Sequence, residues 1–435
     1  MKHRSRIFER ILAVAFGLAI ILSGQQAFAA GGTWTTKTPM PTARSGTGVG
    51  IVNGILHAVG GMNNSGVDLA TVEAYDPTMD SWTPKAPMPT PRHAVGVGVV
   101  NGILYAVSGI NGGVNLSTVE AYDPVNDSWS TKASLPQPQN TYSIGVVNGI
   151  LYAVGGFDGV GTLSTVSAYD PLTNTWTPKV SMPTARYGAA IGVVNGILYA
   201  VGGGGACLGC VLATVEAYDP TMDRWTTKTP MPTARTSIGV GNLNGNLYAV
   251  GGYNGSVLTT VEAYQPVTDT WVTVSPVPAP RCCSSLGVIN GILYAPGGWD
   301  GTIFIATLYA FTPPPTCSGL IATIEGSAGN DFLTGTAGND VIVGLSGNDN
   351  IDGIGGDDFI CGGPGNDTIN GGDGNDVLIG NDGNDILNGG NGNDRLLGNN
   401  GDDAMDGGPG NDRCDGGPHV LGDTAVNCET VTNVP

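Results

Sequence analysis

Residues 362–394 read GGPGNDTINGGDGNDVLIGNDGNDILNGGNGND, and this stretch decides the fold of the C-terminal part of the chain. It repeats a nine-residue unit made of a glycine-rich turn, an aspartate and an aliphatic residue. A helix would scatter this period around its circumference, whereas a coil of short strands and turns stacks it into a ladder. The aspartates of the ten units are Asp331, Asp340, Asp349, Asp358, Asp367, Asp376, Asp385, Asp394, Asp403 and Asp412.

The predicted ladder needs a cation. Stacked strands lie about 4.8 Å apart, and two carboxylates at that distance repel by about 3 kcal/mol at an effective dielectric constant of about 20. Only carboxylate and backbone oxygens are available, with no sulfur or imidazole set nearby in the sequence. The sequence therefore predicts calcium as the ion between the rungs.

The segment from about Gly329 to Gly417 resembles the RTX (repeats-in-toxin) calcium-binding nonapeptides, G-G-x-G-x-D-x-U-x. In that family two nonapeptides form one coil of a parallel β-roll, and an aspartate binds calcium together with the aspartate eighteen residues on. The resemblance implies that all ten aspartates are metal ligands, for up to about eight ions. Leu345 and Asn381 replace the second glycine, so we expect weaker binding at their turns. The aliphatic position holds Leu333, Ile342, Ile351, Ile360, Ile369, Leu378, Leu387, Leu396 and Met405.

A flexible linker rich in glycine, asparagine and aspartate is the alternative for this segment. A linker has no reason to keep an aliphatic residue in register, which favours the roll. The charge distribution agrees. The 435 residues carry a net charge of −19, and the part from Cys317 onward has 18 Asp and 2 Glu against 2 Arg, a net of 2 − 20 = −18. The acidity is therefore a local metal-binding feature, and it argues against nucleic acid as a partner.

The N-terminus reads as a secretory signal over residues 1–29. Lys2, Arg4, Arg6 and Arg10 precede an apolar run from Ile11 to Leu22, which is followed by Ala-Phe-Ala at 27–29. The run is short for a membrane span, and no later stretch qualifies, so we expect no transmembrane segment in the mature chain. These features predict a secreted, extracellular or cell-surface protein of bacterial type. A retained signal anchor is the alternative, and RTX proteins usually use a C-terminal export signal instead.

Eight cysteines, an even number, fit an oxidising compartment. Cys414 takes the aliphatic position of the tenth nonapeptide, and we expect it to bridge to Cys428 and cap the roll. Cys317 and Cys361 are a candidate pair between the start of the roll and an early coil. Cys207 and Cys210 form a C-x-x-C, for which a local disulfide is favoured over a redox or zinc site because no second pair or histidine lies nearby. Adjacent Cys282 and Cys283 receive no assignment.

A second, longer repeat precedes the roll. The phrase N-G-I-L-Y-A-V-G-G and its variants begin at Asn53, Asn101, Asn148, Asn195, Asn244 and Asn290. A T-V-E-A-Y-D-P-like run and a strand with tryptophan follow in each period, with tryptophans at Trp34, Trp82, Trp129, Trp176, Trp225 and Trp271. Strands rich in Val, Ile and Tyr between Asn-Gly and Gly-Gly turns predict four-stranded antiparallel blades.

This second repeat resembles kelch repeats, which build β-propellers. The six units imply a six-bladed, all-β propeller in which the N-terminal strand completes the last blade, because Trp34 comes first and no tryptophan strand follows Phe311. The predicted domains are the signal at 1–29, the propeller at 30–312, a Pro-rich linker at 313–324, the RTX roll at 325–418 and a C-terminal cap at 419–435.

The repeats can be compared with one another. Five units open with Arg (Arg44, Arg92, Arg186, Arg235 and Arg281), and four carry Glu in the third strand (Glu73, Glu120, Glu216 and Glu262). The third unit has Gln139 and Ser167 in these places, and the sixth pairs Arg281 with Leu308. We infer that each Arg forms a partly buried bridge to the Glu of its blade. Arg281 lacks this partner and is the arginine we expect to be freest to meet a ligand.

The loops after the diglycines carry the candidate ligand-binding residues, which are Phe157 with Asp158, Tyr253 with Asn254, and Trp299 with Asp300. In kelch propellers these loops share a face with the loops that precede the first strands. Aromatic rings beside amide and carboxylate groups suit carbohydrate stacking or a protein hot spot. The alternative is that the rings plug the mouth of the propeller against their neighbours.

These features predict a secreted calcium-binding protein whose propeller is a recognition or adhesion module for carbohydrate or protein. No paired acid and base compels catalysis, so a non-enzymatic role is favoured and no catalytic residue is assigned. The enzymatic alternative is a sugar mutarotase or epimerase, because such kelch enzymes are also six-bladed, with Asp158 or Asp300 as the nearest candidate carboxylates. The third alternative is a structural cell-surface or matrix protein. The sequence does not set the oligomeric state.

Overall fold

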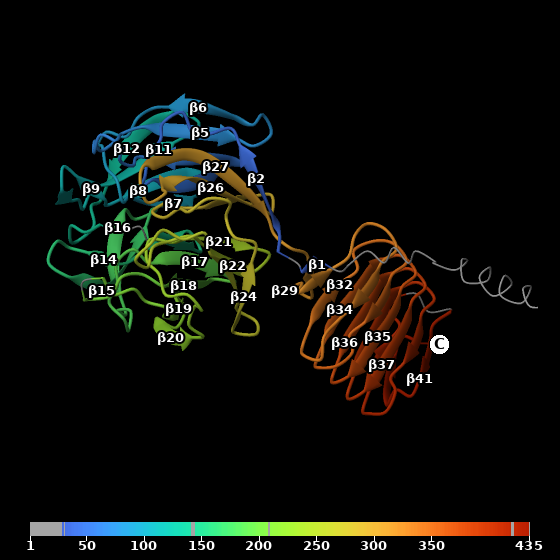
Figure 1. The fold of residues 1–435 in the computed structure, drawn as a ribbon. Coiled ribbons are helices and arrows are strands. Elements are labelled where there is room, and N and C mark those ends of the chain that lie inside the picture. Colours follow the sequence, from blue (N-terminus) through green and yellow to red (C-terminus); the bar gives the residue numbers. More distant parts are fainter. Residues whose placement is uncertain (1–27, 30, 141–143, 208, 419–421, 435) are drawn as a thin grey trace, which may run out of the picture. The chain divides into compact units, whose positions relative to one another are not determined.

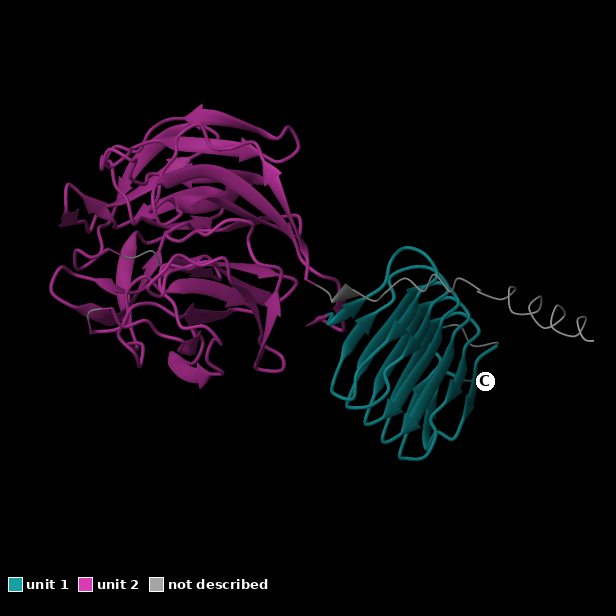
Figure 2. Cartoon of the chain, viewed as in Figure 1, with its two compact units in different colours: residues 1–29, 322–435 teal, residues 30–321 magenta. Residues whose placement is uncertain are grey.

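The computed structural model describes residues 28–29, 31–140, 144–207, 209–418 and 422–434. Its elements there are all strands, so the predicted all-β class is confirmed. No helix in these ranges has the length and apolarity of a membrane span. The chain divides into two compact units, residues 30–321 and residues 1–29 with 322–435 (Figure 2). Most of the predicted signal, residues 1–27, lies outside the described ranges.

Residues 30–321 form a propeller of six four-stranded antiparallel sheets (Figure 1). The first sheet is β3 (Gly48–Val52), β4 (Ile55–Val59), β5 (Val72–Asp76) and β6 (Ser81–Lys85). The second is β7 (Gly96–Val100), β8 (Ile103–Val107), β11 (Val119–Asp123) and β12 (Ser128–Lys132), with a hairpin of β9 (Ile110–Asn111) and β10 (Val114–Asn115) beside it. The third is β13 (Ile144–Val147), β14 (Ile150–Phe157), β15 (Thr162–Asp170) and β16 (Thr175–Lys179).

The fourth sheet is β17 (Ala190–Val194), β18 (Ile197–Val201), β19 (Val215–Asp219) and β20 (Arg224–Lys228). The fifth is β21 (Gly239–Leu243), β22 (Asn246–Val250), β23 (Val261–Gln265) and β24 (Thr270–Val274). The sixth joins β25 (Gly287–Ile289), β26 (Ile292–Trp299) and β27 (Phe304–Thr312) to β2 (Thr33–Lys37) from the N-terminal end. Because β2 pairs with β27, the ring closes with a strand from each end of the propeller.

Tryptophan joins neighbouring blades. The Trp82 ring lies 5.2 Å from the ring of Tyr75 in its own blade, and its Nε1 donates to the Thr38 carbonyl at 2.8 Å. The same indole donation recurs at Trp34, Trp129, Trp176, Trp225 and Trp271. A large apolar ring with one polar atom thus both fills the space between blades and fixes their register.

The second unit is a roll of short parallel strands in two sheets (Figure 1). One sheet contains β30 (Ile324–Glu325), β32 (Val341–Val343), β34 (Phe359–Pro364), β36 (Val377–Asp382), β38 (Arg395–Asn400), β40 (Arg413–Asp415) and β42 (Thr430–Thr432), with β1 (Phe28–Ala29) antiparallel at its edge. The other contains β31 (Phe332–Thr334), β33 (Asn350–Asp352), β35 (Thr368–Asp373), β37 (Ile386–Asn391), β39 (Ala404–Asp406) and β41 (Thr424–Val426). Two hairpin strands, β28 (Thr316–Cys317) and β29 (Leu320–Ile321), precede the roll.

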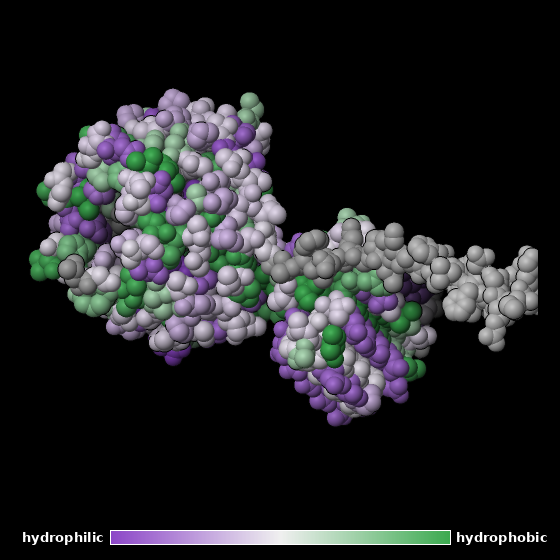
Figure 3. Space-filling model, viewed as in Figure 1, coloured by the Kyte–Doolittle hydropathy of each residue, from purple (hydrophilic) through white to green (hydrophobic). Residues whose placement is uncertain are grey.

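The aliphatic residue of each nonapeptide points inward. Leu333, Cys414 and the eight aliphatic residues between them in the repeat form one continuous core, each at most 2% exposed. Rows of hydrophilic residues run along the outside of the roll (Figure 3). Each coil buries little by itself, so the strands are stable only when stacked on their neighbours.

Candidate metal centre

The ten repeat aspartates form a buried ladder. Each side chain is at most 7% exposed. The backbone N–H of Asp331 donates to Oδ1 of Asp349 at 2.9 Å, and the same bond joins every pair eighteen residues apart up to Asp394 and Asp412. The eighteen-residue spacing inferred from the resemblance therefore corresponds to direct hydrogen bonds between alternate turns. These bonds use one oxygen, Oδ1, of each accepting carboxylate.

The other oxygen of most rungs has no partner. Among the described residues, Oδ2 is buried without a hydrogen-bond donor at Asp349, Asp358, Asp367, Asp376, Asp385, Asp394, Asp403, Asp412 and Asp423. A buried ionised oxygen without a donor costs several kcal/mol unless it is neutralised. The row is therefore an arrangement that a series of cations would complete.

Glycine makes room for a second type of oxygen beside each carboxylate. A Cβ added at Gly371 would meet Oδ2 of Asp376 and would lie 2.5 Å from the carbonyl oxygen of Gly389. The same pair of oxygens, from the aspartate five residues on and the glycine eighteen residues on, surrounds Gly344, Gly353 and Gly389. Carboxylate and carbonyl oxygens are the donor set that calcium prefers, so the residues present fit this ion.

The remaining ligands must come from the backbone or from water. In the part of the chain that the structure describes, no three His, Cys, Asp or Glu side chains gather at one point. Calcium tolerates such a set, because it takes six to eight oxygens in flexible geometry. When bound, the ion would supply positive charge between carboxylates that otherwise face one another.

The pKa values show the electrostatic cost of the ladder without metal. Burial, together with the neighbouring aspartates, raises the pKa of Asp349 and Asp376 to about 6 and that of Asp358 and Asp385 to about 7. Burial also raises the pKa of Asp367, Asp394 and Asp403. Hydrogen bonds from backbone N–H groups lower the pKa of these aspartates, but burial raises it by more. Loss of solvent is therefore the dominant effect.

The first two turns differ from the rest. Ser327 donates both its backbone N–H and its hydroxyl to Oδ2 of Asp331, at 2.6 and 2.9 Å, and Thr336 does the same for Asp340, at 2.6 and 2.8 Å. From the third turn onward the equivalent residue has positive φ, beginning with Leu345 at 77°. Two different turn conformations therefore exist, and only the second leaves Oδ2 without a donor.

The second turn conformation is kept even where the sequence opposes it. Leu345 and Ile354, with φ values of 77° and 74°, are bulky residues in the left-handed region, which costs of order 1–3 kcal/mol each. Asn381 and Asn399 adopt the same region more easily. The residues that replace the second glycine thus preserve the shape of the turn at an energetic cost.

We expect the hydroxyl-bonded turns to lie outside the calcium series. Replacing Ser327 and Thr336 together by glycine removes the hydroxyl donors and permits positive φ, so the double variant should hold two more ions per chain than the wild type. Native mass spectrometry in calcium gives the count. Ser346→Gly is the matched control, because this hydroxyl lies in the third turn and does not donate to Oδ2 of Asp349. This variant should leave the count unchanged. Equal counts for wild type and double variant would contradict the assignment.

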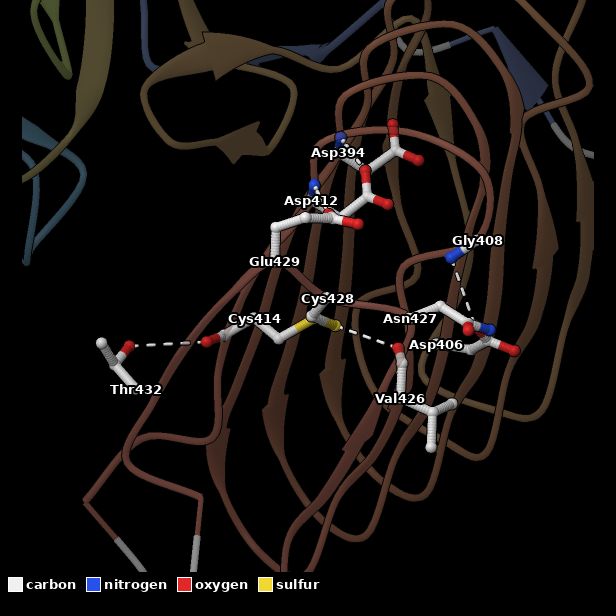
Figure 4. The surroundings of a disulfide bond; sticks show 10 residues. All are labelled: Asp394, Asp406, Gly408, Asp412, Cys414, Val426, Asn427, Cys428, Glu429 and Thr432. Atoms are coloured by element: carbon white, nitrogen blue, oxygen red, sulfur yellow. Dashed lines mark hydrogen bonds between the residues drawn. A yellow bond between two sulfur atoms is a disulfide. The ribbon is translucent and has the colours of Figure 1, made fainter.

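The ladder continues past the last regular repeat. The N–H of Asp403 donates to Oδ1 of Asp423 at 2.8 Å, and that of Asp412 donates to Oε2 of Glu429 at 2.6 Å. Figure 4 shows Asp394, Asp412 and Glu429 on one edge of the roll. Sequence reasoning missed both acceptors, because Asp423 follows Asp403 by twenty residues and Glu429 follows Asp412 by seventeen. The backbone continues the ladder in the same way, because the N–H of Thr424 donates to the carbonyl of Asp403.

Disulfide bonds occur in both units. Cys414 and Cys428 are bridged at the C-terminal end of the roll core (Figure 4), and Cys207 and Cys210 are bridged in the loop after β18. Cys317 and Cys361 are each disulfide-bonded. Cys282 and Cys283 are free thiols.

The candidate aromatic residues of the propeller lie at or just after the end of the second strand of a blade, but they do not form one cluster. Tyr253 is 36% exposed, and its ring centroid lies 6.4 Å from that of Trp299 in the next blade. Phe157 instead packs edge-on against Tyr187, with centroids 6.4 Å apart. Asn254 is exposed beside Tyr253. Sequence reasoning missed Tyr187, which follows Arg186 and has no aromatic equivalent in the other units.

The two candidate carboxylates hold their own turns. Oδ1 of Asp158 accepts from the N–H groups of Val160 and Gly161, and Oδ1 of Asp300 accepts from Thr302 and Ile303. These hydrogen bonds lower the pKa of both aspartates. A carboxylate with a lowered pKa is a poor general base near neutral pH, which weakens the case for catalysis by either residue.

The expectation for Arg281 needs correction. Its side chain is 2% exposed, with the guanidinium 4.4 Å from the centroid of the Tyr309 ring and Nη1 donating to the Ala295 carbonyl at 2.7 Å. Burial lowers its pKa to about 10. The loss of a glutamate partner did not release this arginine to the surface, because its side chain stays buried and an aromatic ring takes the place of the carboxylate.

The other four arginines pair as the repeats predict. Arg92 Nη2 lies 2.6 Å from Glu120 Oε2, and both side chains are almost fully buried. The remaining bridges are Arg44–Glu73, Arg186–Glu216 and Arg235–Glu262. A further contact joins His93 Nδ1 to Asp68 Oδ1 across two blades, and no repeat pattern indicates it because the two residues belong to different repeats.

Comparison with known families now separates the two units. The Kelch motif matches residues 43–89, 91–136, 141–183, 185–232 and 234–278, which together are more than half of the chain. The chain belongs to the Kelch-motif family. Its Kelch repeats form the six-bladed propeller described above. The RTX calcium-binding nonapeptide repeat matches residues 325–360, 352–387, 362–396 and 388–418, so the two resemblances seen in the sequence are confirmed.

The structural comparison agrees on the fold. The solved structure of YjhT matches with a TM-score of 0.56 and 18% sequence identity, covering 62% of this Kelch protein and 95% of YjhT. At this identity the likeness shows the fold alone. A search of curated proteins found no match of significant similarity. RTX repeats imply calcium binding, and together with the disulfides they are typical of extracellular proteins.

Proposed function

We propose that this protein is a secreted, calcium-loaded recognition protein. In this proposal the roll folds around calcium outside the cell, and the propeller binds a carbohydrate or a protein. The observation that carries the calcium part is the row of buried Oδ2 atoms without donors, from Asp349 to Asp423. External calcium is abundant enough to fill sites with dissociation constants of about 10⁻⁴ to 10⁻³ M, whereas calcium before export is scarce.

The recognition part is supported by the Tyr253–Trp299 pair. Trp299 ends strand β26 and Tyr253 follows strand β22, and backbone bridges tie both to the segments before the first strands, Tyr253 to Thr236 and Trp299 to Cys282. A rigid frame under a partly exposed aromatic pair suits stacking against a sugar ring or anchoring a protein loop, because little entropy is lost on binding. Asn254 and Asp300 add polar groups beside the rings.

Screening the full-length protein on glycan and protein arrays in calcium tests this proposal. Trp299→Ala and Tyr253→Ala should each weaken retention by at least about tenfold, the effect expected of an aromatic anchor. Leu172→Ala is the control, because Leu172 is 90% exposed on the turn at the opposite end of its blade and should have no effect. Retention that survives both aromatic substitutions would count against this surface. Calcium-dependent self-association without any ligand would favour the structural alternative.

A further inference from the structure

A ring of equivalent residues surrounds the axis of the propeller. In five units the residue two positions after the opening arginine has positive φ: Gly46, Ala94, Gly188, Ser237 and Cys283. Neighbouring members are joined by backbone hydrogen bonds of 2.8–2.9 Å, such as Cys283 N–H to the Ser237 carbonyl and Gly46 N–H to the Cys283 carbonyl. All five of these residues have small side chains. Cys283 is the one among them that carries a thiol.

Cys283 opens onto the axis. With Ser237, Ser284 and the first strands of several blades, it lines a cavity of about 90 Å³. Its neighbour Cys282 is 3% exposed. The two Sγ atoms lie 2.9 Å apart, within contact distance of each other. The backbone thus holds two thiols in contact, one facing the cavity and the other behind it.

The surroundings favour a thiolate at the cavity side. The contact with the Cys282 thiol, together with the hydroxyls of Ser237 and Ser45, lowers the pKa of Cys283. The same contact, together with burial, raises the pKa of Cys282. A thiolate beside a second thiol is the arrangement that thiol–disulfide exchange requires.

We propose that Cys282 and Cys283 form a reversible dithiol–disulfide site that reacts with small disulfides of the glutathione type. The Cys283 thiolate attacks one sulfur of the small disulfide, whose S–S bond breaks and releases one small thiolate. Cys282 then loses its proton to water, and its sulfur attacks Sγ of Cys283, which releases the second small thiolate. Two protein thiols are oxidised and one small disulfide is reduced to two thiols.

Adjacency makes the product easy to reduce again. Consecutive Cα atoms are about 3.8 Å apart across a trans peptide, which is below the separation usual for disulfides. Strained disulfides have more oxidising potentials and are the labile kind. Cys282 also exchanges two backbone hydrogen bonds of 3.0 Å with Trp299, so formation of the disulfide acts directly on the end of strand β26. The redox chemistry itself does not depend on the proposed recognition function.

Peptide mapping of the full-length protein tests the site. After treatment with oxidised glutathione and then iodoacetamide, the peptide that contains both cysteines should be two hydrogen masses lighter than the dithiol form and carry no alkyl group. Dithiothreitol should restore two alkylated cysteines. Two alkylated thiols after oxidation, or a lasting glutathione adduct on Cys283 beside a free Cys282, would overturn the proposal.

Single substitutions separate the roles of the two thiols. Cys282→Ser should leave a stable glutathione adduct on Cys283, because the resolving thiol is missing. Cys283→Ser should react at least about tenfold more slowly, because the remaining thiol is buried. Equal rates for the two variants would contradict the assignment of Cys283 as the attacking thiol. Unchanged tryptophan fluorescence verifies folding, since all seven tryptophans lie between Trp34 and Trp299.

Discussion

Removing calcium with EDTA is expected to unfold the roll while the propeller stays folded. Each ion that binds only the folded roll stabilises it by about 0.4–1.4 kcal/mol when calcium is one to ten times its dissociation constant. Several ions acting together therefore exceed about 3 kcal/mol. Hydrogen exchange of the full-length protein, followed by mass spectrometry, should show at least about a hundredfold faster exchange in peptides from residues 341–415 and no change in peptides from residues 48–274.

The effect of EDTA should depend on pH in a definite direction. Folding raises the pKa of the buried aspartates, to about 6 for Asp349 and Asp376 and about 7 for Asp358 and Asp385, so the metal-free roll binds more protons than the unfolded chain. Their contribution to stability is present below their unfolded pKa and is lost as the pH rises through the folded values. The metal-free roll should thus be better protected near pH 5 than near pH 8. Equal exchange with and without calcium would refute the metal assignment.

Breaking one buried arginine–glutamate bridge should be among the most damaging single changes in the propeller. Arg92→Gln leaves the Glu120 carboxylate buried without its cation, and loss of one partner of such a pair costs about 3–5 kcal/mol. Guanidinium denaturation followed by tryptophan fluorescence measures the change, because the fluorescence reports on the propeller alone.

The protein supplies a matched control for this experiment. Its third unit has Gln139 and Ser167 where the second has Arg92 and Glu120. Adding Glu120→Ser to Arg92→Gln reproduces that natural pair and removes the uncompensated charge, so the double variant should regain part of the lost stability. A double variant no more stable than Arg92→Gln would show that the cost does not come from the stranded carboxylate.

Repeats explain why so much of this fold follows from the sequence. A period of nine with an aliphatic residue in register has one stable solution, in which Leu378 and its equivalents stack inward and Asp376 and its equivalents stack at the turn. The longer repeat specifies a blade, and the position of Trp34 before the first complete unit specifies which strand closes the ring. Both patterns repeat within short segments of the chain, so they can be recognised in a single sequence.

Sequence reasoning fails at residues whose spacing or side chain departs from the repeat pattern. Asp423 and Glu429 accept rung hydrogen bonds although they follow their donor residues by twenty and seventeen positions instead of eighteen. Ser327 and Thr336 occupy ordinary repeat positions, yet their hydroxyls satisfy the oxygens that later turns leave without donors. Arg281 lost its glutamate but remained enclosed beside Tyr309.

The sequence by itself determined the two architectures, the order of the blades, the inward face of the roll and the chemical nature of its oxygens, because each follows from a short pattern repeated many times. Only the tertiary structure decided which oxygens are free, which aromatic rings meet, and that the Cys282 and Cys283 thiols are in contact beside an axial cavity. Those outcomes depend on distances between atoms of different turns and blades. No repeat period encodes such distances, since they arise only when the chain closes on itself.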